Sequence, residues 1–123
     1  MVQQAGMKLQ EKVMDKHLHP FDAWNELQPH ILGKLGWGFG ELFIATNLSN
    51  WIKELKNQAN IGVMTKVLEL FLVSWVLLDS GRFREYDYMS TQQIHELQDK
   101  CVHLCYDLKP HCIKLSDTFG SKE

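Results

Sequence analysis

The stretch STQQIHELQDKCVHLCYDLKPHCIKLSDTF, residues 90–119, decides the fold. Ser90 and Gln93 form the pattern of a capping box, in which each side chain bonds a backbone N–H of the first helical turn. The stretch therefore predicts a helix over about 91–118, amphipathic and with one face to bury against the rest of the chain. Its apolar residues recur at steps of three and four, with one extra cysteine: Ile94, Leu97, Cys101, Leu104, Cys105, Leu108, Cys112, Leu115 and Phe119.

The length and composition of the chain predict one folded domain over residues 1–123. Hydrophobic residues make up 45% of the chain and charged residues 23%, which excludes a disordered protein. Thirteen Lys and Arg stand against fifteen Asp and Glu without a basic cluster, so nucleic acid is not expected as a partner. Residues 1–16 are too polar for a signal peptide, and all three cysteines fall on one predicted helix, so we expect an intracellular protein.

Three further helices are predicted, over about 2–17, 20–56 and 61–79. Pro20 suits the first turn of a new helix, and Pro29 predicts a bend in the second helix because it lacks a backbone donor. In the third helix, apolar residues surround nearly the whole circumference, which indicates the centre of the core. Its most apolar part, 67–78, is too short to cross a bilayer. The fold predicted is all-α, a bundle of about four helices.

Connections between these helices are predicted from turn-forming residues. Residues 56–62 are polar and contain two asparagines, which suits a link between helices. Gly81 can adopt the left-handed conformation that ends a helix. Residues 82–88, RFREYDY, mix basic, acidic and aromatic side chains and are interpreted as a packed loop.

The three cysteines suggest a metal site, with His103 and His111 nearby in the sequence. No C-x-x-C pair exists to complete a tetrahedral zinc site, however. The simpler interpretation makes Cys101, Cys105 and Cys112 small core residues, because free cysteine is among the most buried residue types. No metal site is predicted.

Other residue clusters suggest chemistry but have simpler structural interpretations. The glycines at 33, 36, 38 and 40 lack the GxGxxG pattern and are expected to let a neighbouring helix approach closely. Three histidines near the helix junction lack a third ligand or carboxylate and are expected to be solvated or capping: His17, His19 and His30.

Two glutamates, Glu41 and Glu69, would be general-base candidates if they were buried. Each is more simply an exposed helix position, and neither has a serine, cysteine or histidine neighbour that makes a recognisable nucleophile arrangement. No catalytic residue is therefore predicted, and no cofactor-binding residue is identified.

The order of motifs along the chain resembles the carboxyl-terminal helical domain of acyl-CoA oxidases. The resemblance covers about residues 5–119 and consists of short structural motifs, without a catalytic signature. The segments that carry it are Ala23-Trp24-Asn25, Gly81-Arg82-Phe83, Met89-Ser90-Thr91-Gln92-Gln93-Ile94, Leu108-Lys109-Pro110 and Leu115-Ser116-Asp117-Thr118-Phe119.

The resemblance implies a peroxisomal flavoenzyme that oxidises fatty acyl-CoA with FAD and passes the electrons to oxygen, giving peroxide. In that family the catalytic glutamate and most flavin and CoA contacts lie in upstream domains, so the resemblance implies that this chain alone is inactive and binds no FAD by itself. Its partners would be the remaining oxidase domains or a second subunit. Ser121-Lys122-Glu123 does not match the peroxisomal Ser-Lys-Leu signal, so import would need another route.

Two functions of different classes remain open from the sequence. The chain is either the C-terminal domain of an acyl-CoA oxidase, as a fragment or a truncated paralogue, or a non-catalytic helical module for interaction or dimerisation. The apolar circumference of 63–78 motivates the second interpretation.

Overall fold

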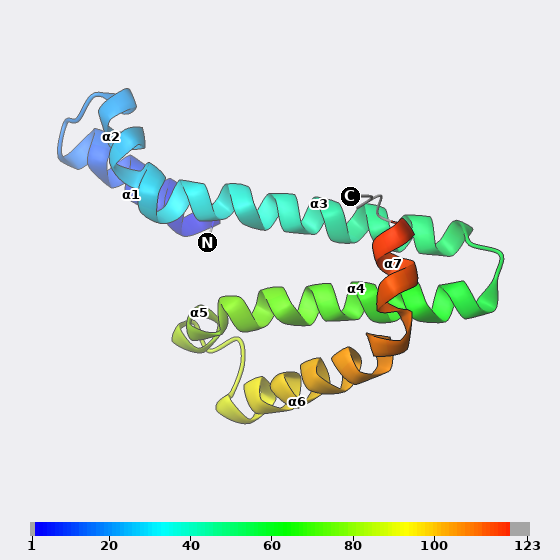
Figure 1. Cartoon of the computed structure of the whole chain (residues 1–123). Helices are drawn as coiled ribbons and strands as arrows, with labels where there is room; N and C mark the ends of the chain where they lie inside the picture. The colour runs from blue at the N-terminus through cyan, green and yellow to red at the C-terminus, as the bar shows by residue number, and fades with distance from the viewer. Residues whose placement is uncertain (1, 119–123) are drawn as a thin grey trace. The chain divides into compact units, whose positions relative to one another are not determined.

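A computed structural model describes residues 2–118 and is all-α, with no strand among these residues (Figure 1). The fold class predicted from the sequence is therefore confirmed. Contacts within the chain divide it into two compact units, residues 1–44 and 45–123. The number of helices is larger than the predicted four, because prolines and local caps divide the long apolar segments.

The first unit contains α1 (Val2–Gln10), α2 (Pro20–Leu27) and the start of α3 (Gly33–Glu54). The prediction of a break before Pro20 is confirmed, because α2 begins at Pro20. His19 caps this helix: its Nδ1 atom accepts a hydrogen bond of 3.3 Å from the N–H of Phe21. His19 is therefore a capping histidine, as predicted. A short buried strip of Ala5, Ala23 and Leu27 joins α1 to α2.

Two π-helical turns interrupt the helices of this unit. The first, Glu11–Asp15, extends α1, so the predicted helix over 2–17 ends two residues early. His17 instead has a left-handed backbone with φ of 52°. The second turn, Gln28–Leu32, contains Pro29, at the position where the sequence predicts a bend. Proline cannot donate to the preceding turn, so the regular hydrogen-bond ladder is lost there and the predicted helix over 20–56 becomes α2, a π turn and α3.

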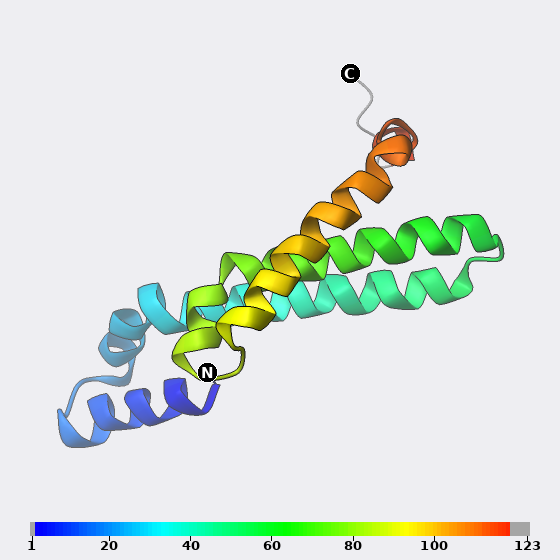
Figure 2. The same cartoon turned by 90° about the horizontal axis from the view of Figure 1, so that it is seen from below.

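The second unit contains the end of α3 together with α4 (Gln58–Leu78), α5 (Ser80–Glu85), α6 (Thr91–Leu108) and α7 (Cys112–Thr118). Helix α6 runs antiparallel to α4 and packs along it, as Figures 1 and 2 show. The prediction that the segment 91–118 buries one face against the rest of the chain is confirmed for α6, and α4 is the helix that it contacts. Ile94, Leu104 and Leu108 of α6 are buried, and Met64 and Val73 are the buried residues of α4.

The start and end of α6 follow the local sequence signals. Ser90 Oγ accepts a 3.2 Å hydrogen bond from the N–H of Gln93, and Gln93 Oε1 accepts one of 2.8 Å from the N–H of Ser90. The predicted capping box is therefore confirmed. At Pro110 a 3-10 turn, Lys109–His111, separates α6 from α7, so the predicted helix over 91–118 is two helices. Phe119, the last residue of the predicted stripe, lies outside the described residues.

Helix α4 begins three residues before the predicted position 61, and its surroundings differ from those expected. Asn57 caps it, because Asn57 Oδ1 accepts hydrogen bonds from the N–H groups of Ala59 and Asn60 at 2.9 and 3.4 Å. The prediction of a helix enclosed on nearly every side is wrong for the described residues, since Leu72 and Leu78 are exposed and most others are half-buried. An apolar circumference creates the capacity for burial, but burial requires neighbours on each side.

The connection after α4 is also more helical than predicted. Gly81 does not adopt the left-handed conformation of a C-terminal cap but lies inside α5, and half of the predicted loop over 82–88 belongs to that helix. The N–H of Arg82 donates a 2.9 Å hydrogen bond to the carbonyl of Asp79, and the Arg82 guanidinium lies 3.5 Å from the Asp79 carboxylate. These local contacts start a new helical turn directly after α4.

Helix α4 is long and apolar enough, by length and composition, to cross a membrane. The prediction considered only 67–78 and therefore underestimated the length of the apolar helix. Helix α4 has 21 residues, and a membrane span needs about 20. A helix of this kind is weak evidence for a span, since core helices of water-soluble proteins reach the same hydropathy. Lys66 and Glu69, its two charged residues, both form ion pairs with α6.

Candidate functional site

The structure places the predicted carboxylates on helix surfaces. Glu69 lies 3.2 Å from the ammonium of Lys100 on α6, and its side chain is 42% exposed. Glu41 is half-buried on α3. Neither glutamate is therefore enclosed by the described part of the chain, in which no polar or charged residue is buried.

A second ion pair joins α4 to α6. Lys66 Nζ donates a 2.6 Å hydrogen bond to Asp107 Oδ2, with both side chains about half exposed. This hydrogen bond, and then the charge of Lys66, lower the pKa of the Asp107 carboxyl, and His103 adds a smaller effect in the same direction. Lys100 and Asp107 of α6 therefore each form an ion pair with α4, on the exposed side of the contact between the two helices.

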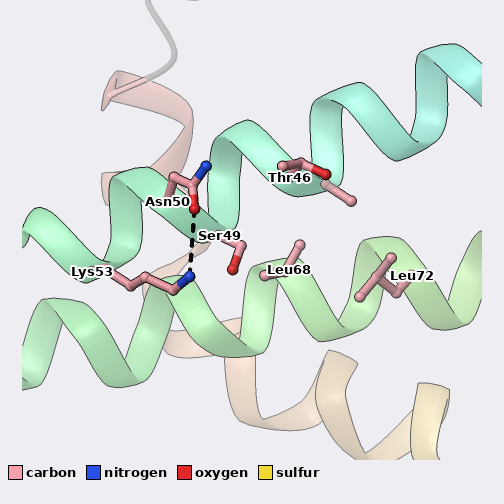
Figure 3. A pocket seen from close by; sticks show the side chains of 7 residues that line it. Thr46, Ser49, Asn50, Lys53, Leu68 and Leu72 are labelled. Carbon is pink, nitrogen blue, oxygen red and sulfur yellow. Dashed lines mark hydrogen bonds between the residues drawn. The ribbon is translucent and has the colours of Figure 1, made fainter.

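A shallow hollow of about 300 Å³, lined by both polar and apolar side chains, lies between the end of α3 and α4. Lys53 Nζ donates a weak 3.4 Å hydrogen bond to Asn50 Oδ1, and Ser49 and Lys53 extend toward α4, where Leu68 and Leu72 lie (Figure 3). This set can offer an ammonium group and hydroxyl groups to a polar ligand. It contains no pair of an acid and a base with which to move a proton.

A second hollow, of about 370 Å³ and almost entirely apolar, lies on the outer side of α6 where the chain bends at Pro110. It is lined by Cys101, Val102, Cys105, Tyr106, Lys109 and Cys112. The prediction that the cysteines are core residues is wrong: Cys105 and Cys112 are exposed and Cys101 is half-buried. Cys105 is one residue beyond Leu104 and is therefore turned about 100° from the buried stripe.

The thiols in this hollow influence one another. The pKa of the Cys105 thiol is raised, first by desolvation against the apolar wall and then by Cys101, through its charge and a hydrogen bond between the two side chains. Cys112 adds a smaller increase in the pKa of Cys105. The Cys112 thiol donates its own hydrogen bond to the carbonyl of Leu108, at 3.5 Å. Cys101 therefore affects the pKa of Cys105 more than Cys112 does, and the Cys112 thiol is hydrogen-bonded to the backbone.

The described side chains show no arrangement of ligands around the histidines of the sequence motifs. Among them, no group of three or more His, Cys, Asp or Glu side chains is placed so that it could hold a metal ion. Within the first unit, a Cβ atom added at Gly36, Gly38 or Gly40 would meet no described atom within 4 Å, and one added at Gly33 would meet only the Gln28 carbonyl oxygen, at 3.2 Å. The close approach of a neighbouring helix to these glycines therefore stays a prediction.

Sequence reasoning missed the ion pairs that position the helices. Lys66 and Asp107 are 41 residues apart, and Lys12 pairs with Glu26 across the junction of the first unit. The sequence indicates only that residues of opposite charge lie beside the apolar stripes. Which of them form ion pairs depends on how the two helices pack against each other.

In a comparison with known families, a family model described as acyl-CoA oxidase matches residues 1–123, the whole chain. No curated protein and no solved structure matches the chain. The segments that carry the sequence resemblance lie on α2, on α5, at the start of α6 and at the turn into α7.

Proposed function

The chain belongs to the acyl-CoA oxidase family, and we propose that it is the carboxyl-terminal helical domain of an FAD-dependent, peroxisomal member, present as a fragment or a truncated paralogue. The complete enzyme would oxidise fatty acyl-CoA to trans-2-enoyl-CoA and reduce O₂ to H₂O₂ in β-oxidation. The family match over residues 1–123 carries this proposal and favours one functional domain across both compact units.

A supporting role for the domain fits the distribution of its apolar side chains. Trp37 is 70% exposed, Phe39 73% and Ile113 80%, although side chains of this size contribute most when they are buried. Large apolar surfaces usually mark contacts with other protein parts. We therefore assign these surfaces to contact with the remaining oxidase domains, which would supply the catalytic residues.

FAD is assigned to the complete enzyme. Cofactor sites combine an enclosed apolar cavity with a few placed polar groups. The two hollows described above are shallow, and no polar or charged residue is buried in the described part of the chain, which supports this assignment.

The second candidate is a non-catalytic helical module for interaction or dimerisation. The exposed apolar residues Leu72 and Leu78 on α4 favour it, because they leave part of the most apolar helix uncovered. This function needs no upstream domain. The mass of the isolated chain in solution distinguishes it from an independent monomer.

The test is to express the 123-residue chain and to measure flavin absorbance, peroxide production on addition of acyl-CoA, and mass in solution. We expect a flavin-free chain that produces no peroxide alone. Peroxide formation by the chain alone would overturn the assignment of catalysis to other domains. A flavin-free monomer would argue against the dimerisation module, and an adjacent reading frame for flavin-binding domains would support the fragment.

A further inference from the structure

The apolar hollow on α6 brings together three cysteines that the proposed function does not use. Cys101 and Cys105 are one helical turn apart and both line the hollow; Cys105 is exposed and Cys101 is half-buried. Neither cysteine belongs to a disulfide. Two free thiols one helical turn apart on the wall of an apolar hollow are a potential ligand pair for a soft ion.

The spacing of this pair selects its chemistry. On a helix, side chains four residues apart have Cβ atoms about 5–6 Å apart, whereas a disulfide requires about 3.5–4.5 Å. A disulfide between Cys101 and Cys105 would therefore distort α6. A bridging ion would not, because each sulfur atom then bonds the ion and the two sulfur atoms stay farther apart than the roughly 2.05 Å of a disulfide bond.

We propose that Cys101 and Cys105 form a two-thiolate site for a soft monovalent cation, with Cu(I) as the fitting ion. Binding forms two Cu–S bonds, and each thiol releases its proton to solvent. No electron is transferred, so copper stays in the monovalent state. The product is a bis-thiolate complex with one net negative charge.

The surroundings favour Cu(I) over zinc. Structural zinc takes four protein ligands, whereas among the described side chains no group of three or more is arranged so that it could hold a metal ion. Thiolate ligands select soft ions such as Cu(I). Lys109 also lines the hollow, and its positive charge complements the negative charge of the complex.

Cys112 provides a matched control within the same hollow. It lies beyond the 3-10 turn, and its thiol is hydrogen-bonded to the Leu108 carbonyl. If the spacing of one helical turn creates the site, Cys112 is not a ligand. If any exposed thiol in the hollow suffices, Cys112 contributes as much as the others.

The experiment titrates the reduced 123-residue chain, without oxygen, with Cu(I) held by a chromogenic chelator, and follows the loss of the chelator colour. We expect one Cu(I) per chain. Loss of one ligand should weaken binding by at least about tenfold in Cys101→Ser and in Cys105→Ser, because even outer-shell changes cost about 10–100-fold. Cys112→Ser should bind like the wild type.

Circular dichroism of each variant establishes that α6 remains folded, and X-ray absorption counts the sulfur ligands. Two sulfur ligands together with the expected variant pattern would support the site. A wild-type chain that takes no copper from the chelator, an equal loss in Cys112→Ser, or three sulfur ligands would overturn it. None of these outcomes depends on flavin or acyl-CoA, so the proposed function and this site can fail separately.

Discussion

Helices α4 and α6 pack against each other but use their apolar residues differently. Helix α6 has a single stripe and buries Ile94, Leu104 and Leu108 from it. Helix α4 is apolar on nearly every side, yet buries only Met64 and Val73. Apolar content thus sets how much a helix can bury, and the number of neighbours sets how much it does bury.

The largest expected effect comes from a charge in the stripe of α6. Leu104→Asp should lower the free energy of unfolding by roughly 3–5 kcal/mol, because Leu104 is buried and an aspartate there would have no partner. Urea denaturation measures the change. This variant tests whether the interface between α4 and α6 forms a core.

Lys100→Asp is the matched control on the same helix. Lys100 is half exposed and pairs with Glu69, so its loss should cost about 1 kcal/mol or less. Equal destabilisation by the two variants would show that the faces of α6 are assigned wrongly.

An intermediate effect is expected at the start of α6. Ser90→Ala removes the acceptor for the N–H of Gln93 and should cost about 1 kcal/mol. Ser90→Asp, which restores an acceptor, should recover most of this loss, and Thr91→Ala serves as the neighbouring control. An unchanged stability in Ser90→Ala would mean that packing on α4 alone fixes the start of the helix.

The smallest effect is expected from the ion pair between Lys66 and Asp107, because both side chains are exposed. The folded state lowers the pKa of Asp107, so its contribution is present above the ordinary value of 3.8 and disappears as pH falls through the folded value. Asp107→Asn should therefore lower Tm slightly at pH 7 and not at a pH well below 3.8.

Asp99→Asn, on the same helix, is the control for loss of a carboxylate without this pair. Thermal melts of both variants across pH check the prediction. A difference between Asp107→Asn and the wild type that persists in acid would assign the effect to something other than the pair with Lys66.

Local signals explain which features were predicted correctly. The capping box at Ser90 and the break at His19-Pro20 each depend on residues within one or two turns, so their physical causes are visible in the sequence. The start of α4 was placed too late, although Asn57 was a visible cap, because the polar segment around it was interpreted as a link.

The errors concern positions whose environment is made by distant residues. Gly81 was assigned a cap because glycine permits that conformation, but contacts with Asp79 continue the chain as α5. The cysteines were assigned to the core on residue type. Their exposure depends on which side of α6 contacts α4, and that contact leaves the side chains of Cys105 and Cys112 exposed.

The sequence by itself determined the all-α fold, the principal helix caps and the amphipathic face of α6, because hydrogen-bond capping and helical periodicity act over a few residues. Only the tertiary structure decided that α4 remains partly uncovered and that the thiols line an accessible hollow. It also decided the ion pairs between α4 and α6, in which Lys66 binds Asp107 and Lys100 binds Glu69. These features depend on which helix surfaces meet, and residues far apart in the sequence decide that together.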